Sequence, residues 1–309
     1  MRASHLKAIF PSCETDVDLK NLTTVKTGGR AEIVFRPQTE EELIKSIVFA
    51  KQNDLNYFIL GEGSNCLASD EGYSGIIIKL TPYFCQIGFD GEYVVADAGA
   101  KTAMLSSFCL KYQFSGAEFL ASLPASVGGA TVMNAGCFGQ SMSDIVVAVD
   151  AVNQDGKKHF EKEQLCFDYR QSMFLNADYA VTKVYFRFET KPKEYILQKT
   201  RDIILAKKSS QPLNKPSFGS VFKRCKLGSV AKLIDDLGFK GFSFNGAKVS
   251  EKHAGFFIND KNATTNDFLM LIDIVGQKVL DEYGILLVPE VRYIGDKDDL
   301  GRLSYTHNL

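Results

Sequence analysis

Three polar residues, far apart in the chain, have types suited to proton transfer and anion binding. Ser220 lies between Gly219 and the strand-favouring pair Val221-Phe222, so we expect it at the start of a strand, with its hydroxyl facing whatever passes the glycine. Arg170 carries a guanidinium, which binds a carboxylate or phosphate through two donors and stays charged. Glu290 follows a proline at the expected start of another strand.

Each of the three residues also has a more ordinary interpretation. Most Gly-Ser pairs are turns. An arginine before a loop, such as Arg170, is more often part of a surface salt bridge. Glu290 would then be an exposed edge residue paired with Arg292. On residue types alone, these interpretations remain open.

Two regions rich in small residues indicate a phosphate-bearing ligand. In the first, Gly61-Glu62-Gly63-Ser64-Asn65, backbone N–H groups freed by the glycines can converge on a phosphate oxygen. It is not a Rossmann fingerprint, because Cys66 takes the place of the third glycine and no helical pattern follows. The second, residues 124–136, includes Gly128 and Gly129. A turn explains either region alone, whereas two such regions in one domain favour a dinucleotide.

Length, composition and charge exclude several classes of protein. The chain of 309 residues is long enough for two or three domains, and its 45% apolar and 24% charged residues are ordinary for a globular protein. A formal net charge of −1 gives no reason to expect nucleic acid or a membrane surface as partner. No apolar run approaches the ~18 residues of a membrane-spanning helix. Residues 1–20 have no continuous apolar core and therefore do not resemble a signal peptide.

The cysteines and histidines give no indication of a metal site. The seven cysteines are scattered, odd in number and never spaced as C-x-x-C, which indicates reduced thiols in a cytoplasmic protein. The four histidines lie far apart in the sequence and form no ligand pattern. We therefore expect neither a metal centre nor a disulfide framework.

Local patterns predict a chain of mixed α and β elements. A capping box at Thr39-Glu40-Glu41-Glu42 predicts the start of one helix, and Gly284 the end of a strongly periodic one. Further helices are expected at residues 102–112, 194–208 and 230–237. Strands are expected at residues 57–60, 76–80, 92–96, 181–189 and 255–259, with a hairpin at 145–160 and a strand pair at 285–294. Pro192 begins a change of character, and we place the main domain boundary there.

Taken together, these segments closely resemble the UDP-N-acetylenolpyruvoylglucosamine reductases of peptidoglycan synthesis. The resemblance runs from about residue 21 to residue 295 and rests on the order and spacing of its elements, since no single one is specific. The elements are residues 21–31, 60–65, 124–136, 169–172, 219–223, 249–255 and 289–292.

The resemblance implies the fold class α+β, with an FAD-binding region of the vanillyl-alcohol-oxidase type followed by an α/β substrate-binding domain. Residues 1–192 would form the FAD-binding region in two subdomains, residues 193–295 the substrate domain, and residues 296–309 a polar tail. The short connections around Ser220 are similar to the compact subtype of the family, which lacks an inserted loop carrying a tyrosine.

The resemblance also implies roles for individual residues. Ser220 matches the proton donor of the family, and Arg170 and Glu290 match its other two active-site residues. Tyr169, Arg170 and Lys223 are assigned to the substrate. The residues assigned to FAD are Gly61, Glu62, Gly63, Ser64, Asn65, Ser126, Gly128, Gly129 and Gly136. Departures from the family pattern at Ala125, Gln171 and Arg224 fall outside the three catalytic positions.

The implied activity is reduction of an enolpyruvyl ether on a sugar nucleotide, with non-covalent FAD and NADPH as cofactors. A hydride would reach C3 of the enolpyruvyl group, Arg170 would hold the carboxylate of the resulting enolate, and Ser220 would protonate C2. Glu290 would either donate a hydrogen bond to this intermediate as a neutral acid or orient it. The protein is expected to be a cytoplasmic monomer that acts on a small-molecule sugar nucleotide, without nucleic-acid or membrane partners.

Two other classes of function remain open at this point. One is a related flavoprotein oxidase of alcohols or lactones, which would react with O₂ and ignore NADPH. The other is a non-catalytic FAD-binding module, in which Ser220, Arg170 and Glu290 are structural. Oxidation of NADPH that depends on the sugar nucleotide is expected only of the reductase.

Overall fold

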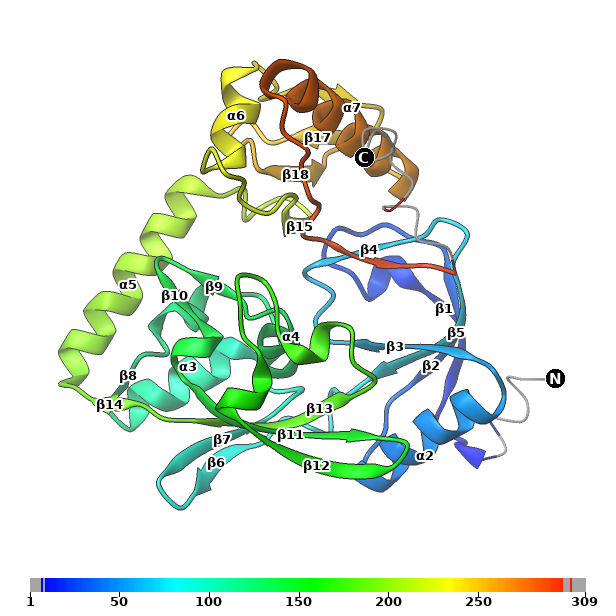
Figure 1. Ribbon diagram of the computed structural model, residues 1–309, viewed down its shortest axis with the longest axis vertical. Helices are drawn as coiled ribbons and strands as arrows, with labels where there is room; N and C mark the ends of the chain where they lie inside the picture. The colour runs from blue at the N-terminus through cyan, green and yellow to red at the C-terminus, as the bar shows by residue number, and fades with distance from the viewer. Residues whose placement is uncertain (1–6, 8, 297–300, 302–309) are drawn as a thin grey trace.

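The computed structural model describes residues 7, 9–296 and 301, so most of the polar tail predicted at residues 296–309 lies outside the described residues. Two regions are stacked with a connecting helix along one side (Figure 1). We call residues 9–210 the N-terminal region and residues 211–291 the C-terminal region. Each contains both helices and strands, as the fold class α+β predicts.

The two larger sheets of the N-terminal region share one hydrophobic core. The first has the order β1-β2-β5-β3, with β2, β5 and β3 parallel and β1 antiparallel to β2. The second is antiparallel, with the order β12-β11-β13-β7-β6. The strand bounds are β1 Glu14–Asp18, β2 Arg30–Phe35, β3 Asn56–Leu60, β5 Tyr73–Lys79, β6 Ile87–Asp90, β7 Tyr93–Asp97, β11 Val146–Asn153, β12 Gly156–Glu161 and β13 Ala180–Phe186. The strands expected at residues 57–60, 76–80, 92–96 and 181–189 and the hairpin at 145–160 are thereby confirmed.

Helix α2, Glu40–Gln52, packs against both sheets of this region. Its buried Leu43 and Ile47 belong to the same core as Ile33 of β2 and Val149 of β11. Thr39 caps its N-terminus by accepting a hydrogen bond from the backbone N–H of Glu42. The helix start predicted from the capping box is therefore confirmed, although the Glu42 carboxylate accepts from the backbone N–H of Gln38 rather than from that of Thr39.

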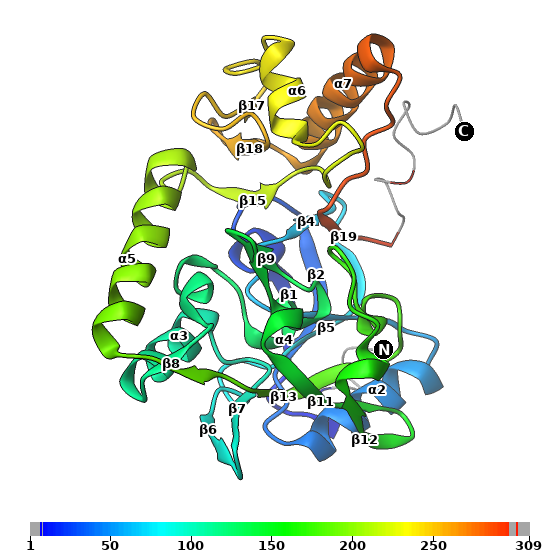
Figure 2. The ribbon, with the colours of Figure 1, turned by 60° about the vertical axis from the view of Figure 1, so that its left-hand side comes forward.

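Three further α-helices follow α2 in the N-terminal region. They are α3 Thr102–Lys111, the short α4 Val127–Val132 and α5 Lys193–Ser210. Helix α5 runs along one side of the molecule and joins the two regions (Figures 1 and 2). It packs against α3 and against the 3₁₀-helix η2, Glu118–Ser122, and its Ile203 belongs to the N-terminal core. The domain boundary at residue 192 stays a prediction, and by packing α5 lies with the N-terminal region.

The C-terminal region is a four-stranded antiparallel sheet, ordered β15-β18-β17-β16, with two helices. Its elements are β15 Ser217–Ser220, α6 Val230–Asp236, β16 Ser243–Phe244, β17 Ala247–Val249, β18 Phe256–Asn259 and α7 Thr265–Tyr283. Helix α7 ends at Gly284, which has φ +62°, a left-handed conformation that glycine adopts without strain. The apolar face predicted from its periodicity is buried, including Phe268, Leu271 and Val275.

The last strand differs from the prediction. Residues 285–294 do not form a strand pair; the described structure has one strand there, β19 Arg292–Ile294, which pairs in parallel with β4, Cys66–Ala68, of the N-terminal region. Local apolar patterns predict that a segment is extended but not which strand it meets, because that partner lies more than 200 residues away. Helix α7 is also joined to the N-terminal region, since the Asp70 carboxylate accepts from the backbone N–H groups of Thr265 and Asn266.

No helix in the described residues is long and apolar enough to cross a membrane. All seven cysteines are free thiols.

Candidate active site

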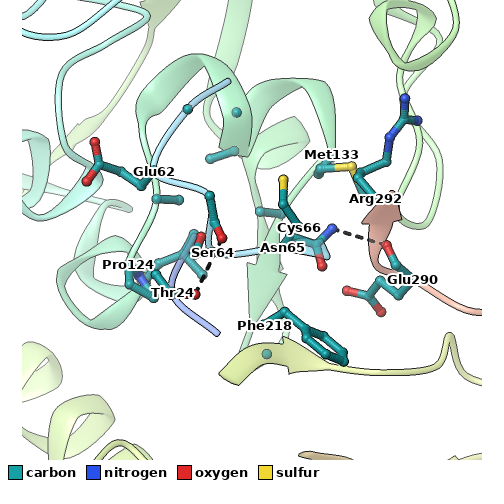
Figure 3. Close-up of a pocket in the computed structure, with 18 of the residues that line it drawn as sticks. Thr24, Glu62, Ser64, Asn65, Cys66, Pro124, Met133, Phe218, Glu290 and Arg292 are labelled. Carbon is teal, nitrogen blue, oxygen red and sulfur yellow. Dashed lines mark hydrogen bonds between the residues drawn. The ribbon is translucent and has the colours of Figure 1, made fainter. Parts of the chain in front are cut away.

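A cavity of about 1230 Å³ lies between the two regions and collects the candidate residues. Its lining includes both small-residue loops, Tyr169, Arg170, Ser220 and Glu290, and Figure 3 shows part of it. Ligand sites for drug-sized molecules measure roughly 300–1,000 Å³. This cavity is large enough for a dinucleotide together with a second ligand.

The first loop connects β3 to β4 and packs directly on the second. A Cβ on Gly61 would lie 2.5 Å from Ser126 Oγ, so a side chain at position 61 would displace this hydroxyl. Gly63 has φ +65° and fits against the Leu22 carbonyl, where a Cβ would lie 2.1 Å away. The Lys79 ammonium donates to the Gly61 carbonyl over 2.5 Å, and burial lowers the pKa of this lysine.

The second loop leads into α4. Ser126 caps this helix by accepting a hydrogen bond from the backbone N–H of Gly129 over 3.2 Å. A Cβ on Gly128 would lie 2.7 Å from the Ala98 Cβ, and one on Gly136 would lie 2.4 Å from the Gln140 carbonyl oxygen. Gly61, Gly63, Gly128 and Gly136 therefore permit close packing of protein against protein. The expectation that the glycines free backbone N–H groups for a phosphate does not include this packing requirement, although both loops line the cavity.

Arg170 and Glu290 form an ion pair in the wall of the cavity. Arg170 Nε donates to Glu290 Oε1 over 2.7 Å, and Arg170 Nη2 donates to the Gly136 carbonyl over 3.0 Å. Only 21% and 12% of the two side chains are exposed. Arg170 has φ +54°, in a turn closed by paired backbone hydrogen bonds between Asp168 and Gln171. The hydrogen bonds between Asp168 and Gln171 hold Arg170 in this left-handed conformation. Strained backbone of this kind is common at functional sites.

The environment of Glu290 contradicts its interpretation as an exposed edge residue paired with Arg292. Its backbone N–H donates to the Val221 carbonyl over 2.7 Å, and its carbonyl accepts from Asn65 Nδ2 over 3.1 Å, the bond drawn in Figure 3. Arg292 instead donates to the Leu175 carbonyl over 3.3 Å. Glu290 is thus held by one backbone bond from each region.

Ser220 is the last residue of β15, not the first residue of a strand as the sequence predicts. Gly219 has φ +85°, and the pairing of β15 with β18 is irregular between Ser217 and Ser220, so the strand ends before Val221 and Phe222. Ser220 lines the cavity, and its hydroxyl has no hydrogen-bond partner in the described part of the chain. The hydroxyl is therefore available to a ligand.

Tyr169 lies where the main cavity meets a smaller one of about 360 Å³. Its ring centre is 5.0 Å from the Arg170 guanidinium carbon, and its hydroxyl accepts a hydrogen bond from the backbone N–H of Arg224 over 3.3 Å. Lys223 lines the smaller cavity together with Arg224 and Lys226, and it is not among the residues lining the main one. Lys223 therefore lies beside the main cavity, whereas Ser220, Arg170 and Glu290 line it.

The cavity residues that were not predicted from the sequence include Cys66, Lys207, His253 and Arg292. Burial raises the pKa of the Cys66 thiol to about 12 and lowers the pKa of His253. Arg292 lies opposite Cys66 and lines the cavity because β19 pairs with β4. Lys207 is in a helix of polar composition, and no local pattern distinguishes it from its exposed neighbours.

Comparison with known proteins identifies the two regions. Residues 31–159 match the family model described as "FAD binding domain", and residues 211–294 match the C-terminal domain of UDP-N-acetylenolpyruvoylglucosamine reductase. A flavin-binding domain joined to a second domain over a shared cavity defines a flavin-dependent oxidoreductase of two domains.

Full-length relatives and a solved structure give the family. The chain is 36% identical to the UDP-N-acetylenolpyruvoylglucosamine reductase of Caldanaerobacter subterraneus, over 90% of this chain and 92% of the relative. It is 38% identical to that of Alkaliphilus oremlandii, over 91% and 93%. The crystal structure of the Thermus caldophilus enzyme superposes with a TM-score of 0.78 at 32% identity, covering 90% of this chain and 97% of that one. The chain belongs to the UDP-N-acetylenolpyruvoylglucosamine reductase family.

Proposed function

We propose that this protein reduces the enolpyruvyl ether of UDP-N-acetylglucosamine enolpyruvate to UDP-N-acetylmuramate, a step of peptidoglycan biosynthesis, with FAD and NADPH. The observation that carries the assignment is the arrangement of Ser220, Arg170 and Glu290 around one cavity between a flavin-binding region and a second domain. Bound FAD supplies hydride transfer from NADPH to C3 of the enolpyruvyl group.

The cavity fits a flavin dinucleotide. Its volume of about 1230 Å³ exceeds the usual range for a small ligand, and both small-residue loops line it. We assign Gly61, Glu62, Gly63, Ser64, Asn65, Ser126, Gly128, Gly129 and Gly136 to this cofactor. In this assignment the glycines pack the loops closely enough for their backbone N–H groups to face one ligand.

Arg170 stabilises the negative charge that develops on the substrate. Hydride addition at C3 leaves an enolate whose charge extends over the carboxylate. Of the five N–H donors of the guanidinium, one bonds Glu290 and one bonds the Gly136 carbonyl, which leaves three for the substrate. Glu290 orients Arg170, because a planar guanidinium held at Nε cannot rotate freely.

Ser220 donates the proton that completes the reaction at C2. A serine hydroxyl is a weak acid in water, so it requires the strongly basic enolate carbon as its acceptor. The hydroxyl has no partner in the described residues, which leaves its proton available to the ligand. The alkoxide that remains is reprotonated from solvent in the cavity.

Tyr169 and Lys223 are assigned to the substrate beyond its reacting group. Tyr169 is 43% exposed and borders both cavities, so a ligand that extends past it meets the cations of the smaller one, Lys223 and Arg224. Phosphate oxygens of a nucleotide sugar are suitable partners for these charges. We also propose that the protein acts in the cytoplasm as a monomer, which light scattering of the purified protein tests.

A steady-state assay tests the proposed function. Purified protein with FAD should oxidise NADPH only when UDP-N-acetylglucosamine enolpyruvate is present. NADPH oxidation coupled to O₂ alone, or oxidation of an alcohol without NADPH, would assign the chain to another flavoprotein class. Binding of FAD with neither activity would leave a non-catalytic module.

A further inference from the structure

A second polar group lies in the cavity wall, at the side covered by α5. Lys207 of this helix is 5% exposed, and its ammonium donates to the Ser122 carbonyl over 2.7 Å. The Ser122 hydroxyl is itself buried and has no hydrogen-bond partner in the described residues. Both residues line the cavity.

This group has a net positive charge without a counter-ion. The hydrogen-bond partner of Lys207 is a neutral carbonyl, and no carboxylate among the described residues pairs with it. Glu118, the acid of the 3₁₀-helix η2 that contains Ser122, is paired with Lys199 instead. Burial lowers the pKa of Lys207, which reflects the cost of the uncompensated charge. An unpaired buried cation and an unpaired buried hydroxyl each destabilise the protein unless a ligand completes them.

We propose that Lys207 and Ser122 form a diphosphate-binding subsite of the cavity. A diphosphate supplies negative charge for the ammonium and an acceptor oxygen for the hydroxyl, so it completes both groups at once. Two ligands of the reaction carry a diphosphate, FAD and the UDP-sugar. The inference rests on the proposed function for these two ligands, and its test measures binding rather than turnover.

The alternative is that Lys207 only supports the loop by holding the Ser122 carbonyl. The two explanations predict different effects of Lys207→Met on the melting temperature and on ligand affinity. If Lys207 is a support, Lys207→Met lowers the melting temperature of the FAD-free protein and leaves ligand affinities unchanged. If Lys207 binds a diphosphate, Met fills a similar volume without a buried charge, so the melting temperature of the FAD-free protein is unchanged or higher while ligand affinity falls.

The experiment compares Lys207→Met with Lys208→Met in the full-length chain. Lys208 is the next residue of α5, is exposed and does not line the cavity, so its replacement controls for the loss of one positive charge. Dissociation of FAD from the holoenzyme is followed by flavin fluorescence, and UDP binding to the holoenzyme by calorimetry. Riboflavin, which lacks the diphosphate, is the matched probe for the rest of the flavin site.

We expect Lys207→Met to weaken either FAD or UDP binding by roughly 10- to 100-fold, the value of one to two charge-assisted hydrogen bonds. Weaker FAD binding with unchanged riboflavin binding assigns the subsite to the cofactor, and weaker UDP binding alone assigns it to the substrate. Lys207→Arg should retain most of the affinity, and Lys208→Met all of it. Unchanged affinity for both FAD and UDP in Lys207→Met would overturn the proposal.

Ser122→Ala is the second variant, since it removes the hydroxyl without a change in charge. We expect the FAD-free protein to melt at the same or a higher temperature, because a buried group without a partner is gone. Affinity for the same ligand that Lys207→Met affects should fall by several-fold. A Ser122→Ala protein that binds both ligands as tightly as wild type would exclude the hydroxyl from the subsite. A failure of the steady-state assay alone would contradict the proposed function and leave these binding results unaffected.

Discussion

Arg170 and Glu290 are separated by 120 positions in the chain, and their side chains meet in the cavity wall at 2.7 Å. Arg170 is fixed within the N-terminal region by the Gly136 carbonyl. Glu290 bonds through its backbone to Asn65 in that region and to Val221 in the other. The ion pair therefore forms only when both regions are docked, and its geometry reports on that docking.

Arg170→Lys should lower turnover by about 10²-fold, although it preserves the charge. Lysine loses the planar arrangement of donors, so it cannot bond Glu290, the Gly136 carbonyl and a substrate carboxylate at the same time. Steady-state kinetics with saturating NADPH measure the effect, and bound flavin absorbance controls for cofactor loss. Near-normal turnover would reassign Arg170 to a structural ion pair.

Ser220→Ala should separate the two halves of the catalytic cycle. The change removes a hydroxyl that has no partner in the described residues, so fold and FAD content should be preserved. Flavin reduction by NADPH needs no proton from this residue and should keep its rate. Flavin reoxidation by the enolpyruvyl substrate should slow by roughly 10²–10⁴-fold.

Stopped-flow absorbance measures the two half-reactions on wild type and on Ser220→Ala. Equal slowing of both would mean that Ser220 shapes the flavin site. If neither half slows, Ser220 is not the proton donor, and the irregular end of β15 has a structural role only.

Gly61→Ala should disturb the contact between the two cavity loops. The new Cβ would lie 2.5 Å from Ser126 Oγ, and overpacking of this kind costs roughly 1–3 kcal/mol of unfolding free energy. Ser126→Ala removes that oxygen but also the cap of α4, at about 1 kcal/mol. The double variant should therefore lose less stability than the sum of the single variants.

Urea unfolding of the four proteins measures this coupling. Gly88→Ala is the control, because a Cβ at Gly88 meets nothing within 4 Å. Strict additivity of the two changes would show that the loops relax independently.

Stability should fall in acid through Asp150, a buried carboxylate of β11. Burial alone raises the pKa of Asp150, but hydrogen bonds from His159, Lys157 and Tyr185 outweigh it and hold the pKa below its ordinary value. A carboxyl whose pKa is lowered in the native state binds its proton at a lower pH than in the unfolded chain. The ionised carboxylate therefore stabilises the fold above about pH 4, and this contribution is lost as the pH falls through the native pKa. Asp150→Asn should thus be less stable than wild type at about pH 7, and the difference should narrow toward about pH 3.

Chemical unfolding at the two pH values tests this prediction. Asp54→Asn, at an exposed turn with φ +50° that asparagine tolerates, controls for the loss of one carboxylate. An equal deficit of Asp150→Asn at both pH values would show that its charge does not contribute.

Much of the fold was predictable because it depends on local patterns. The periodicity of α7 and its end at Gly284, the hairpin of β11 and β12, and the cap of α2 all arise from residues close in sequence. The strand at residues 292–294 was predicted with the wrong partner, because pairing with β4 depends on contacts across the whole chain. The position of Ser220 at the end of β15 depends on the left-handed Gly219, whose conformation the sequence permits but does not require.

Fewer features of the candidate site than of the fold could be predicted from local sequence patterns. Arg170, Glu290 and Ser220 were expected together only through a family resemblance, and no spacing rule connects them. The glycines were correctly placed at the cavity, but their tight contacts are with other protein atoms. Lys207 was missed because its burial arises from the packing of α5 on η2, which makes one lysine of a polar helix different from the next.

The parallel pairing of β4 with β19 also has a consequence for cooperativity. The chain leaves the N-terminal region at α5, forms the C-terminal region and then returns to the N-terminal region through β19. Neither region can therefore unfold alone without loss of the pairing between β19 and β4. Val25 and Leu67 of the N-terminal region are buried in the C-terminal core, which adds apolar surface to the same coupling. Two covalently sequential regions therefore form one thermodynamic unit, and calorimetry should record a single unfolding transition with equal calorimetric and van't Hoff enthalpies.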